Sequence, residues 1–256
     1  MITAGIDAGA KTVKAVILRD GELVGRSMVP AGFDTREAAE KAYNQALAAG
    51  GVACKEVKAV IATGAGRKEI PFASDTVTEV GADARGVARL FPSARTVIDV
   101  GAEEGRAIRI DEAGKVLDFA VNEKCAAGAG AFTEPMARAL EVPLEELGEF
   151  SLQSTKAVPM NAQCTVFAES EVVTLVHAKT PKADIARAVH DAIADRVTST
   201  VRRVGITKDV ALIGGLARNV GFVKSLEEDL KLKLLIPSDP EFTGAFGAAL
   251  IALDKN

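Results

Sequence analysis

Ile6-Asp7-Ala8-Gly9, close to the amino terminus, returns 92 positions later as Ile98-Asp99-Val100-Gly101. After each copy the chain runs through an apolar stretch, a turn that contains glycine and a second apolar stretch, with the turns at Asp20-Gly21 and Glu112-Ala113-Gly114. Apolar runs that flank such turns are typical of β-hairpins, because glycine adopts the positive φ of tight turns at little cost. The repeat therefore predicts two similar domains, each built on a strand that leads into a hairpin.

Segments with helical patterns separate these strand-like runs. Asp34, with Glu37 three residues later, is a capping-box arrangement that opens a helix ending near Gly50. Thr180-Pro181 predicts the start of a long helix, with Thr180 as the N-cap, because proline is tolerated at the first helical position. Gly205 is placed to end that helix.

The carboxyl-terminal part adds a buried strand at Val210 to Ile213, a short strand at Leu234 to Ile236 and a last helix within residues 243–256. Alternating strands and helices predict an α/β fold. We expect residues 1–95, together with that last helix, to form the first domain. We expect residues 96–242 to form the second.

Composition limits the classes of function. The chain has 256 residues, 31 Lys plus Arg against 35 Asp plus Glu, and a formal net charge of -4. This balance gives no electrostatic reason to expect nucleic acid or an anionic membrane surface as a partner. No secretion signal and no apolar stretch long enough to span a bilayer is evident, so we expect a cytoplasmic protein. Its three cysteines argue against a disulfide framework and leave reduced thiols or metal ligands.

The first copy of the repeat has features of a phosphate-binding loop. Glycine in the segment from Asp7 to Thr12 lets backbone N–H groups approach phosphate oxygens, and Lys11 or Lys14 can add positive charge. The spacing of the P-loop is absent. We expect Asp7 and Asp99 to face each other across a cleft and to hold Mg²⁺ through its water molecules.

Gly214-Gly215 follows the buried strand and would let adenosine approach the backbone. With the duplicated Asp-x-Gly segments, this pattern resembles the superfamily of actin, hexokinase and acetate kinase, whose duplicated ribonuclease-H-like domains bind ATP. The resemblance implies that ATP is bound by Gly9, Ala10, Lys11, Thr12, Val13, Lys14, Gly101, Gly214, Gly215 and Arg218, with Glu241 and Gly244 near the base or ribose. The alternative is that each glycine serves only a turn or close packing.

The second loop reads Gly101-Ala102-Glu103-Glu104-Gly105. A carboxylate here can orient or deprotonate the water that attacks the γ-phosphate, and we assign that role to Glu103. The alternatives are that Glu104 performs it, or that either glutamate is a solvated turn residue. Asp7, Asp99 and Glu103 are thus the candidate catalytic residues.

Two cysteines precede helical segments. Cys125 lies before the small-residue run Ala126 to Gly130, and Cys164 lies before an apolar helical pattern. Helix N-terminal N–H groups stabilise a neighbouring anion, and a thiolate-bound iron-sulfur cluster carries negative charge. The alternative is that each cysteine is a small buried hydrophobe.

The segments Asn122 to Gly130 and Cys164 to Glu171 resemble the cysteine segments of the BadF/BadG/BcrA/BcrD ATPase family. This family includes ATP-binding subunits of benzoyl-CoA reductase and activators of 2-hydroxyacyl-CoA dehydratases. In it each subunit gives two cysteines to one 4Fe-4S cluster shared by two subunits. The resemblance implies that Cys125 and Cys164 are the cluster ligands, whereas Cys54 matches no ligand position.

Two branches of the family are open. The second loop departs from the Gly-Gly-Gln-Asp of the dehydratase activators. With the segments 158–163 and 177–181, it looks closer to the D-type subunit of ATP-dependent benzoyl-CoA reductase. That branch implies a paralogous ATPase subunit, catalytic reductase subunits and ferredoxin as electron donor. The alternatives are a homodimeric dehydratase activator and, from other classes, a small-molecule kinase or an actin-like assembly protein.

Overall fold

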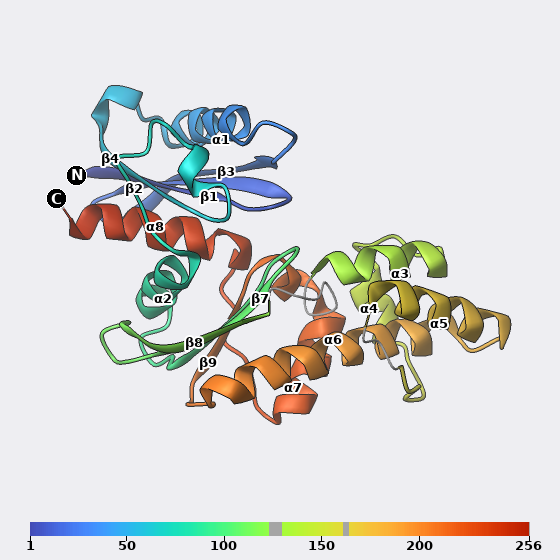
Figure 1. Ribbon diagram of the computed structural model, residues 1–256. Coiled ribbons are helices and arrows are strands. Elements are labelled where there is room, and N and C mark those ends of the chain that lie inside the picture. The colour runs from blue at the N-terminus through green and yellow to red at the C-terminus, as the bar shows by residue number, and fades with distance from the viewer. Residues whose placement is uncertain (123–129, 161–163, 256) are drawn as a thin grey trace. The chain divides into compact units, whose positions relative to one another are not determined.

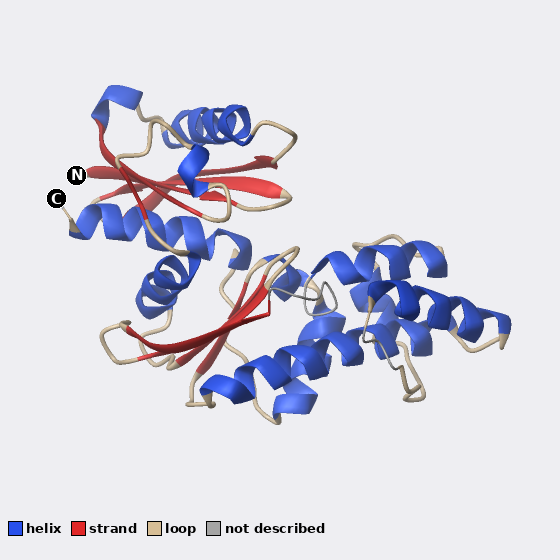
Figure 2. Cartoon of the chain, viewed as in Figure 1, coloured by secondary structure: helices blue, strands red, loops and turns tan. Residues whose placement is uncertain are grey.

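A computed structural model describes residues 1–122, 130–160 and 164–255. The contacts divide the chain into two compact units. Unit 1 comprises Met1–Arg95, Ile110–Leu117 and Glu241–Asn256, and unit 2 comprises Thr96–Arg109 and Asp118–Pro240. Both units combine helices with β-sheet, as the secondary-structure colours of Figure 2 show. That the units correspond to two domains stays a prediction.

Unit 1 contains a five-stranded mixed sheet in the order β3-β2-β1-β4-β5. Its strands are β1 (Ile2–Ala8), β2 (Thr12–Arg19), β3 (Glu22–Pro30), β4 (Val57–Thr63) and β5 (Asp75–Thr76). β1 pairs antiparallel with β2 and parallel with β4. Asp20 and Gly21 have φ values of 53° and 85° in the β2–β3 turn, which confirms the predicted hairpin.

Helices cover both faces of this sheet (Figure 1). They are α1 (Thr35–Gly50), α2 (Glu79–Leu90) and α8 (Thr243–Asp254). The Asp34 side chain accepts a hydrogen bond from the Glu37 N–H, 3.0 Å, and caps α1 as predicted. Glycine permits the close approach of α8: a Cβ on Gly5 of β1 would lie 1.9 Å from the Ala245 carbonyl oxygen. Two 3₁₀ turns, Cys54–Glu56 and Arg67–Glu69, flank β4.

Unit 2 repeats this pairing scheme in a sheet of order β8-β7-β6-β9. Its strands are β6 (Thr96–Val100), β7 (Gly105–Ile110), β8 (Val116–Asn122) and β9 (Val210–Ile213). β6 pairs antiparallel with β7 and parallel with β9, just as β1 does with β2 and β4. The duplication predicted from the sequence is confirmed as an α/β fold with two mixed sheets.

One predicted strand was wrong. Residues 234–236 form a single bridge, between Leu235 and Ala211, and not a strand. Only two backbone hydrogen bonds hold it, from the Leu212 N–H to the Leu235 oxygen and from the Leu235 N–H to the Val210 oxygen, both 2.9 Å. Pro237 follows at once and has no N–H to extend the pairing.

The helices of unit 2 are α3 (Thr133–Leu140), α4 (Leu147–Ser151), α5 (Thr165–His177), α6 (Lys182–Val204) and α7 (Val220–Leu230). Three 3₁₀ turns, at Gly130–Phe132, Gly215–Arg218 and Pro240–Phe242, complete the chain. The predicted C-cap of α6, Gly205, is confirmed. Its N-cap is Pro181 and not Thr180, because the Thr180 N–H bonds to the Leu175 oxygen at the end of α5, 3.1 Å.

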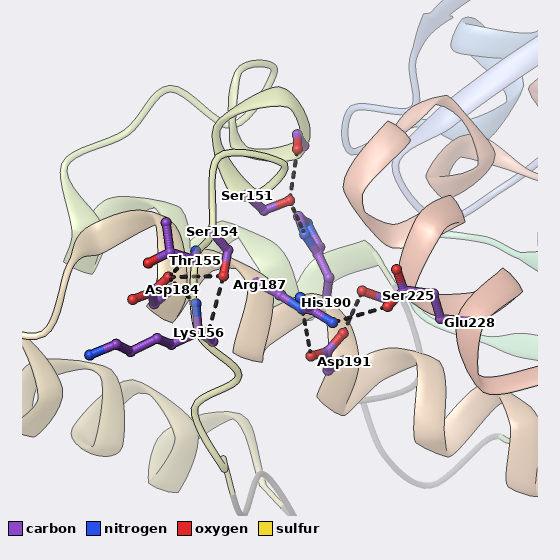
Figure 3. Close-up of polar contacts among 11 residues, drawn as sticks. Ser151, Ser154, Thr155, Lys156, Asp184, Arg187, His190, Asp191, Ser225 and Glu228 are labelled. Atoms are coloured by element: carbon purple, nitrogen blue, oxygen red, sulfur yellow. Dashed lines mark hydrogen bonds and ion pairs between the residues drawn. The ribbon is translucent and has the colours of Figure 1, made fainter.

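A buried polar network joins α4, α6 and α7 (Figure 3). Fully buried His190 places Nδ1 3.0 Å from the Ser151 hydroxyl. That hydroxyl donates its proton to the Gly148 oxygen, 2.7 Å, so His190 donates from Nδ1. Asp191 accepts from Ser225 of α7, 2.6 Å. Nε2 of His190 finds no hydrogen-bond partner within the described ranges, and burial lowers the pKa of His190 to about 4 from 6.5.

The low pKa of His190 predicts acid sensitivity. The folded protein holds this ring neutral, whereas the unfolded chain binds its proton near pH 6.5. The free energy of unfolding should therefore fall by about 1.4 kcal/mol per pH unit from pH 6.5 towards pH 4. Denaturant titrations across this range measure the slope. His190→Gln should flatten it, whereas His177→Gln should leave it unchanged; an equal slope in His190→Gln would contradict the assignment.

Candidate functional site

The first predicted phosphate loop is the tight turn between β1 and β2. The Gly9 N–H donates to the Thr12 oxygen, 3.1 Å, which closes the turn, and Ala10 and Lys11 are exposed at its tip. Val13 is fully buried in the core of unit 1, so only its main chain is available to a ligand. The turn therefore offers backbone groups and the Lys11 side chain to a ligand.

Asp7 and Lys14 lie side by side behind this turn. They are directly paired across β1 and β2, and the Lys14 Nζ is 3.2 Å from Asp7 Oδ2. Both side chains are largely buried, with 14% and 18% of their area exposed for Lys14 and Asp7. The lysine offsets the charge of the aspartate, which limits the cost of holding that carboxylate away from water.

The second loop repeats this arrangement in unit 2. Asp99 is directly paired with Arg106 across β6 and β7, and Arg106 Nη1 is 2.7 Å from Asp99 Oδ2. Arg106 lies 92 positions after Lys14, the same interval that separates Asp99 from Asp7. The sequence interpretation missed this second cation, although the interval reveals it.

The two glutamates of the second loop differ in environment. Glu104 forms an ion pair with Arg106 and so joins the Asp99 network. Glu103 is exposed and makes no ion pair with the described residues. The Gly101 N–H closes the turn by donating to the Glu104 oxygen, 2.9 Å. An exposed Glu103 carboxylate is available to a water molecule, and its role stays a prediction.

Gly214 lies against Asp99 at the end of β9. Its φ of 87° and ψ of 172° are essentially restricted to glycine. A Cβ there would lie 2.4 Å from Asp99 Oδ1, whereas one on Gly215 would meet no atom within 4 Å. Arg218, in the following turn, forms an ion pair with Asp239, 3.1 Å.

The two remaining predicted nucleotide contacts lie in unit 1. Glu241 is in the turn before α8, and Gly244 is in the first turn of that helix. A Cβ on Gly244 would lie 3.1 Å from Asp83 Oδ1 and 3.8 Å from Asp7 Oδ2. Gly244 is thus beside the carboxylates of the first loop.

Cys164 is the N-cap of α5, as the sequence predicted for the start of a helix. It is partly exposed, and its side chain makes no capping hydrogen bond. Val166 and Phe167, which follow it, are 66% and 71% exposed. Cys125 lies outside the described residues. Elsewhere in the chain, over the described ranges, no three His, Cys, Asp or Glu side chains are grouped to hold a metal ion.

Backbone hydrogen bonds join the second loop to the residues that follow the Cys125 segment. The Gly130 N–H donates to the Gly101 oxygen, 2.8 Å, and the Ala131 N–H donates to the Ala102 oxygen, 2.7 Å. The Thr133 hydroxyl then donates to the Gly130 oxygen, 2.6 Å, at the start of α3. The phosphate loop of unit 2 and the entry to α3 are therefore one connected structure.

Comparison with known proteins gives the family. Residues 4–252 match the profile of the BadF/BadG/BcrA/BcrD ATPase family. The chain belongs to this family of ATPases. It is 38% identical to the 2-hydroxyisocaproyl-CoA dehydratase activator of Clostridioides difficile over 100% of this chain and 96% of that protein. It is 35% identical to the D-type subunit of benzoyl-CoA reductase from Thauera aromatica over 97% of this chain and 92% of that one.

Solved structures agree with this placement. Component A of the Acidaminococcus fermentans (R)-2-hydroxyglutaryl-CoA dehydratase has a TM-score of 0.96 and 37% identity, covering 100% of this chain and 98% of its own. A glucokinase of the ROK family from Streptomyces griseus, at 15% identity and a TM-score of 0.57 over 99% of this chain and 100% of its own, shares the fold alone. The resemblance to the actin and hexokinase fold is thus confirmed. None of the helices within the described ranges is both long and apolar enough to cross a membrane.

Gly214 gives a direct test of the geometry around Asp99. Gly214→Ala should lower the free energy of unfolding by about 1–3 kcal/mol, because alanine does not tolerate this backbone conformation and its Cβ would collide with Asp99. Gly215→Ala is the matched control and should be tolerated. Thermal and denaturant unfolding of both variants measure the difference; equal stabilities would show that the backbone at position 214 is not held as described.

Proposed function

We propose that this protein is the ATP-hydrolysing, electron-transferring component of a two-component enzyme that acts on an acyl-CoA. Family membership supports the ATPase part. Relatives named as a dehydratase activator and as a reductase component support the second component, a catalytic partner protein. The observation that carries the proposal is the pair of backbone hydrogen bonds from Gly130 and Ala131 to the second phosphate loop.

Each unit supplies one phosphate-contacting loop. In this proposal the backbone of Gly9 to Thr12 and the Lys11 side chain bind phosphate oxygens in unit 1, and Gly101 does so in unit 2. Asp7 and Asp99 bind the water shell of Mg²⁺, which keeps several of its waters in proteins. Gly214 and Gly215 take the adenosine, with Arg218, Glu241 and Gly244 as further contacts, and Glu103 orients the attacking water.

Cys125 and Cys164 would hold half of a 4Fe-4S cluster. The position of Cys164 fits this role, because it is partly exposed at the N-terminus of a 13-residue helix whose N–H groups favour an anion. Such a cluster supplies one-electron transfer and takes four thiolates, so two such chains, identical or paralogous, are needed to complete it. The exposed Val166 and Phe167 beside Cys164 suit burial against that second chain.

ATP and a cluster belong together for an energetic reason. Moving a cluster from about −400 mV to about −700 mV spans roughly 300 mV, or about 7 kcal/mol for one electron. Hydrogen bonds to sulfur alone would not readily supply this amount. A change in the Gly101 to Glu104 loop on ATP binding or hydrolysis reaches Gly130 and Ala131 directly, and so reaches the segment that contains Cys125.

Two branches of the family remain as partners for this chemistry. The Glu103-Glu104 loop and its Arg106 ion pair favour the D-type subunit of benzoyl-CoA reductase, with ferredoxin as electron donor. The 38% identity over the full length of a dehydratase activator favours a homodimeric activator. The branches differ in whether a second, different ATPase chain accompanies this one in its native complex.

The cysteine assignment has a sharp test. Cys125→Ser and Cys164→Ser should each abolish iron binding, expected at about four irons per pair of chains in the parent protein, and should leave ATP binding unchanged. Cys54→Ser, in a 3₁₀ turn of unit 1, is the control and should keep all of its iron. Iron content, visible absorption and ATP affinity of anaerobically purified protein measure this. Full iron content in either of the first two variants would refute the assignment.

A further inference from the structure

A third loop, absent from the sequence prediction, lies beside Asp7 in unit 1. Thr63 ends β4 and is directly paired with Asp7 of the parallel strand β1. Gly64 follows with a φ of 90°, and a Cβ on it would lie 2.4 Å from the Ala8 oxygen. Side chains of directly paired residues project from the same face of a sheet, so Thr63 and Asp7 share a face.

The Thr63 hydroxyl is an unsatisfied group. The side chain is only 1% exposed, and Oγ1 has no hydrogen-bond partner in the part of the chain that the structure describes. Burying a hydroxyl without a partner destabilises a fold, so a threonine kept at such a site indicates a ligand that satisfies it.

The internal repeat supports a functional origin for this threonine. In unit 2 the residue directly paired with Asp99 on the parallel strand is Ile213, and Gly214 follows it. Gly214 approaches the Val100 oxygen as Gly64 approaches the Ala8 oxygen, so Thr63-Gly64 and Ile213-Gly214 are equivalent. The same place in the fold thus accepts a buried isoleucine, and unit 1 has a hydroxyl there instead.

A second carboxylate meets this face. Ile61, two residues before Thr63 on the same face of β4, packs with Ala82 of α2 and Ala248 of α8. One step further along that face the next residues of these elements are Thr63, Asp83 and Gly244. Asp83 is 5% exposed, and the Gly244 Cβ position is 3.1 Å from its Oδ1 and 3.8 Å from Asp7 Oδ2.

We infer that Thr63 and Asp83, together with Asp7, bind the hydrated divalent cation that accompanies the nucleotide phosphates. The inference rests on the proposed ATP-binding function and adds two residues to it. Two carboxylates and a hydroxyl are oxygen ligands of the kind that Mg²⁺ and its waters take. With Lys14 pairing Asp7, the Asp83 carboxylate supplies the additional negative charge that a divalent cation requires. Gly244 leaves the space between the two carboxylates free of a side chain.

The test measures Mn²⁺ binding by electron paramagnetic resonance, with intact protein and a non-hydrolysable ATP analogue. Asp83→Asn and Thr63→Val should each weaken Mn²⁺ binding at least about tenfold, as expected for the loss of a hydrogen bond to a charged group. Affinity for the analogue without divalent cation should stay within about twofold of the parent protein, which separates cation binding from nucleotide binding. Thr63→Val should also melt at an equal or higher temperature without nucleotide, because it removes an unsatisfied buried group.

Matched controls remove the same groups elsewhere in unit 1. Asp75→Asn removes an exposed carboxylate, and Thr3→Val removes a buried hydroxyl that donates to the Ala249 oxygen, 2.9 Å. Both should bind Mn²⁺ as the parent protein does. If the parent protein binds analogue and Mn²⁺ while Asp83→Asn and Thr63→Val bind Mn²⁺ equally well, this inference is overturned and the proposed function stands. A lower melting temperature of Asp83→Asn with unchanged Mn²⁺ affinity would likewise overturn it, since Asp83 would then only cap α8. A parent protein that binds neither ligand overturns both.

Discussion

Two backbone hydrogen bonds, from Gly130 and Ala131 to the Gly101 and Ala102 oxygens, are the constraint on which the rest of the proposed mechanism depends. They join the loop that follows β6 to the chain just after Cys125. The Thr133 hydroxyl continues the connection into α3. A loop that moves with the phosphates of a nucleotide cannot keep these bonds unless the entry to α3 moves with it. Nucleotide chemistry and the cysteine segment are therefore coupled within one unit.

Duplication explains how one chain can hold both functions. Each unit places an aspartate at the end of its first strand and a cation directly across the hairpin, Lys14 for Asp7 and Arg106 for Asp99. From this common plan the copies diverge. Unit 1 buries Thr63 where unit 2 buries Ile213, and unit 2 inserts the helices α3 to α5, with Cys164 at the N-terminus of α5. The shared scaffold serves phosphate binding, and the divergent parts carry the specific chemistry.

The sequence revealed the repeated strand and hairpin, because contiguous residues carry that signal. It also contained the Lys14 and Arg106 pair at the same interval, although the Asp-x-Gly motif alone does not include these cations. Thr63 and Asp83 could not be found in this way. They meet Asp7 only through the parallel register of β1 and β4 and the packing of α2 and α8 against that sheet, which link residues far apart in the chain. The strand expected at 234–236 failed because apolar composition does not show how many partners a strand will find.

The coupling of nucleotide to the cysteine segment is tested most directly by the midpoint potential of the iron centre. Anaerobic redox titration, followed by electron paramagnetic resonance, compares the protein alone with the protein saturated by a non-hydrolysable ATP analogue. A potential or a spectrum that changes when the analogue binds is the predicted result. An identical potential and spectrum, with bound analogue demonstrated in the same sample, would contradict the coupling.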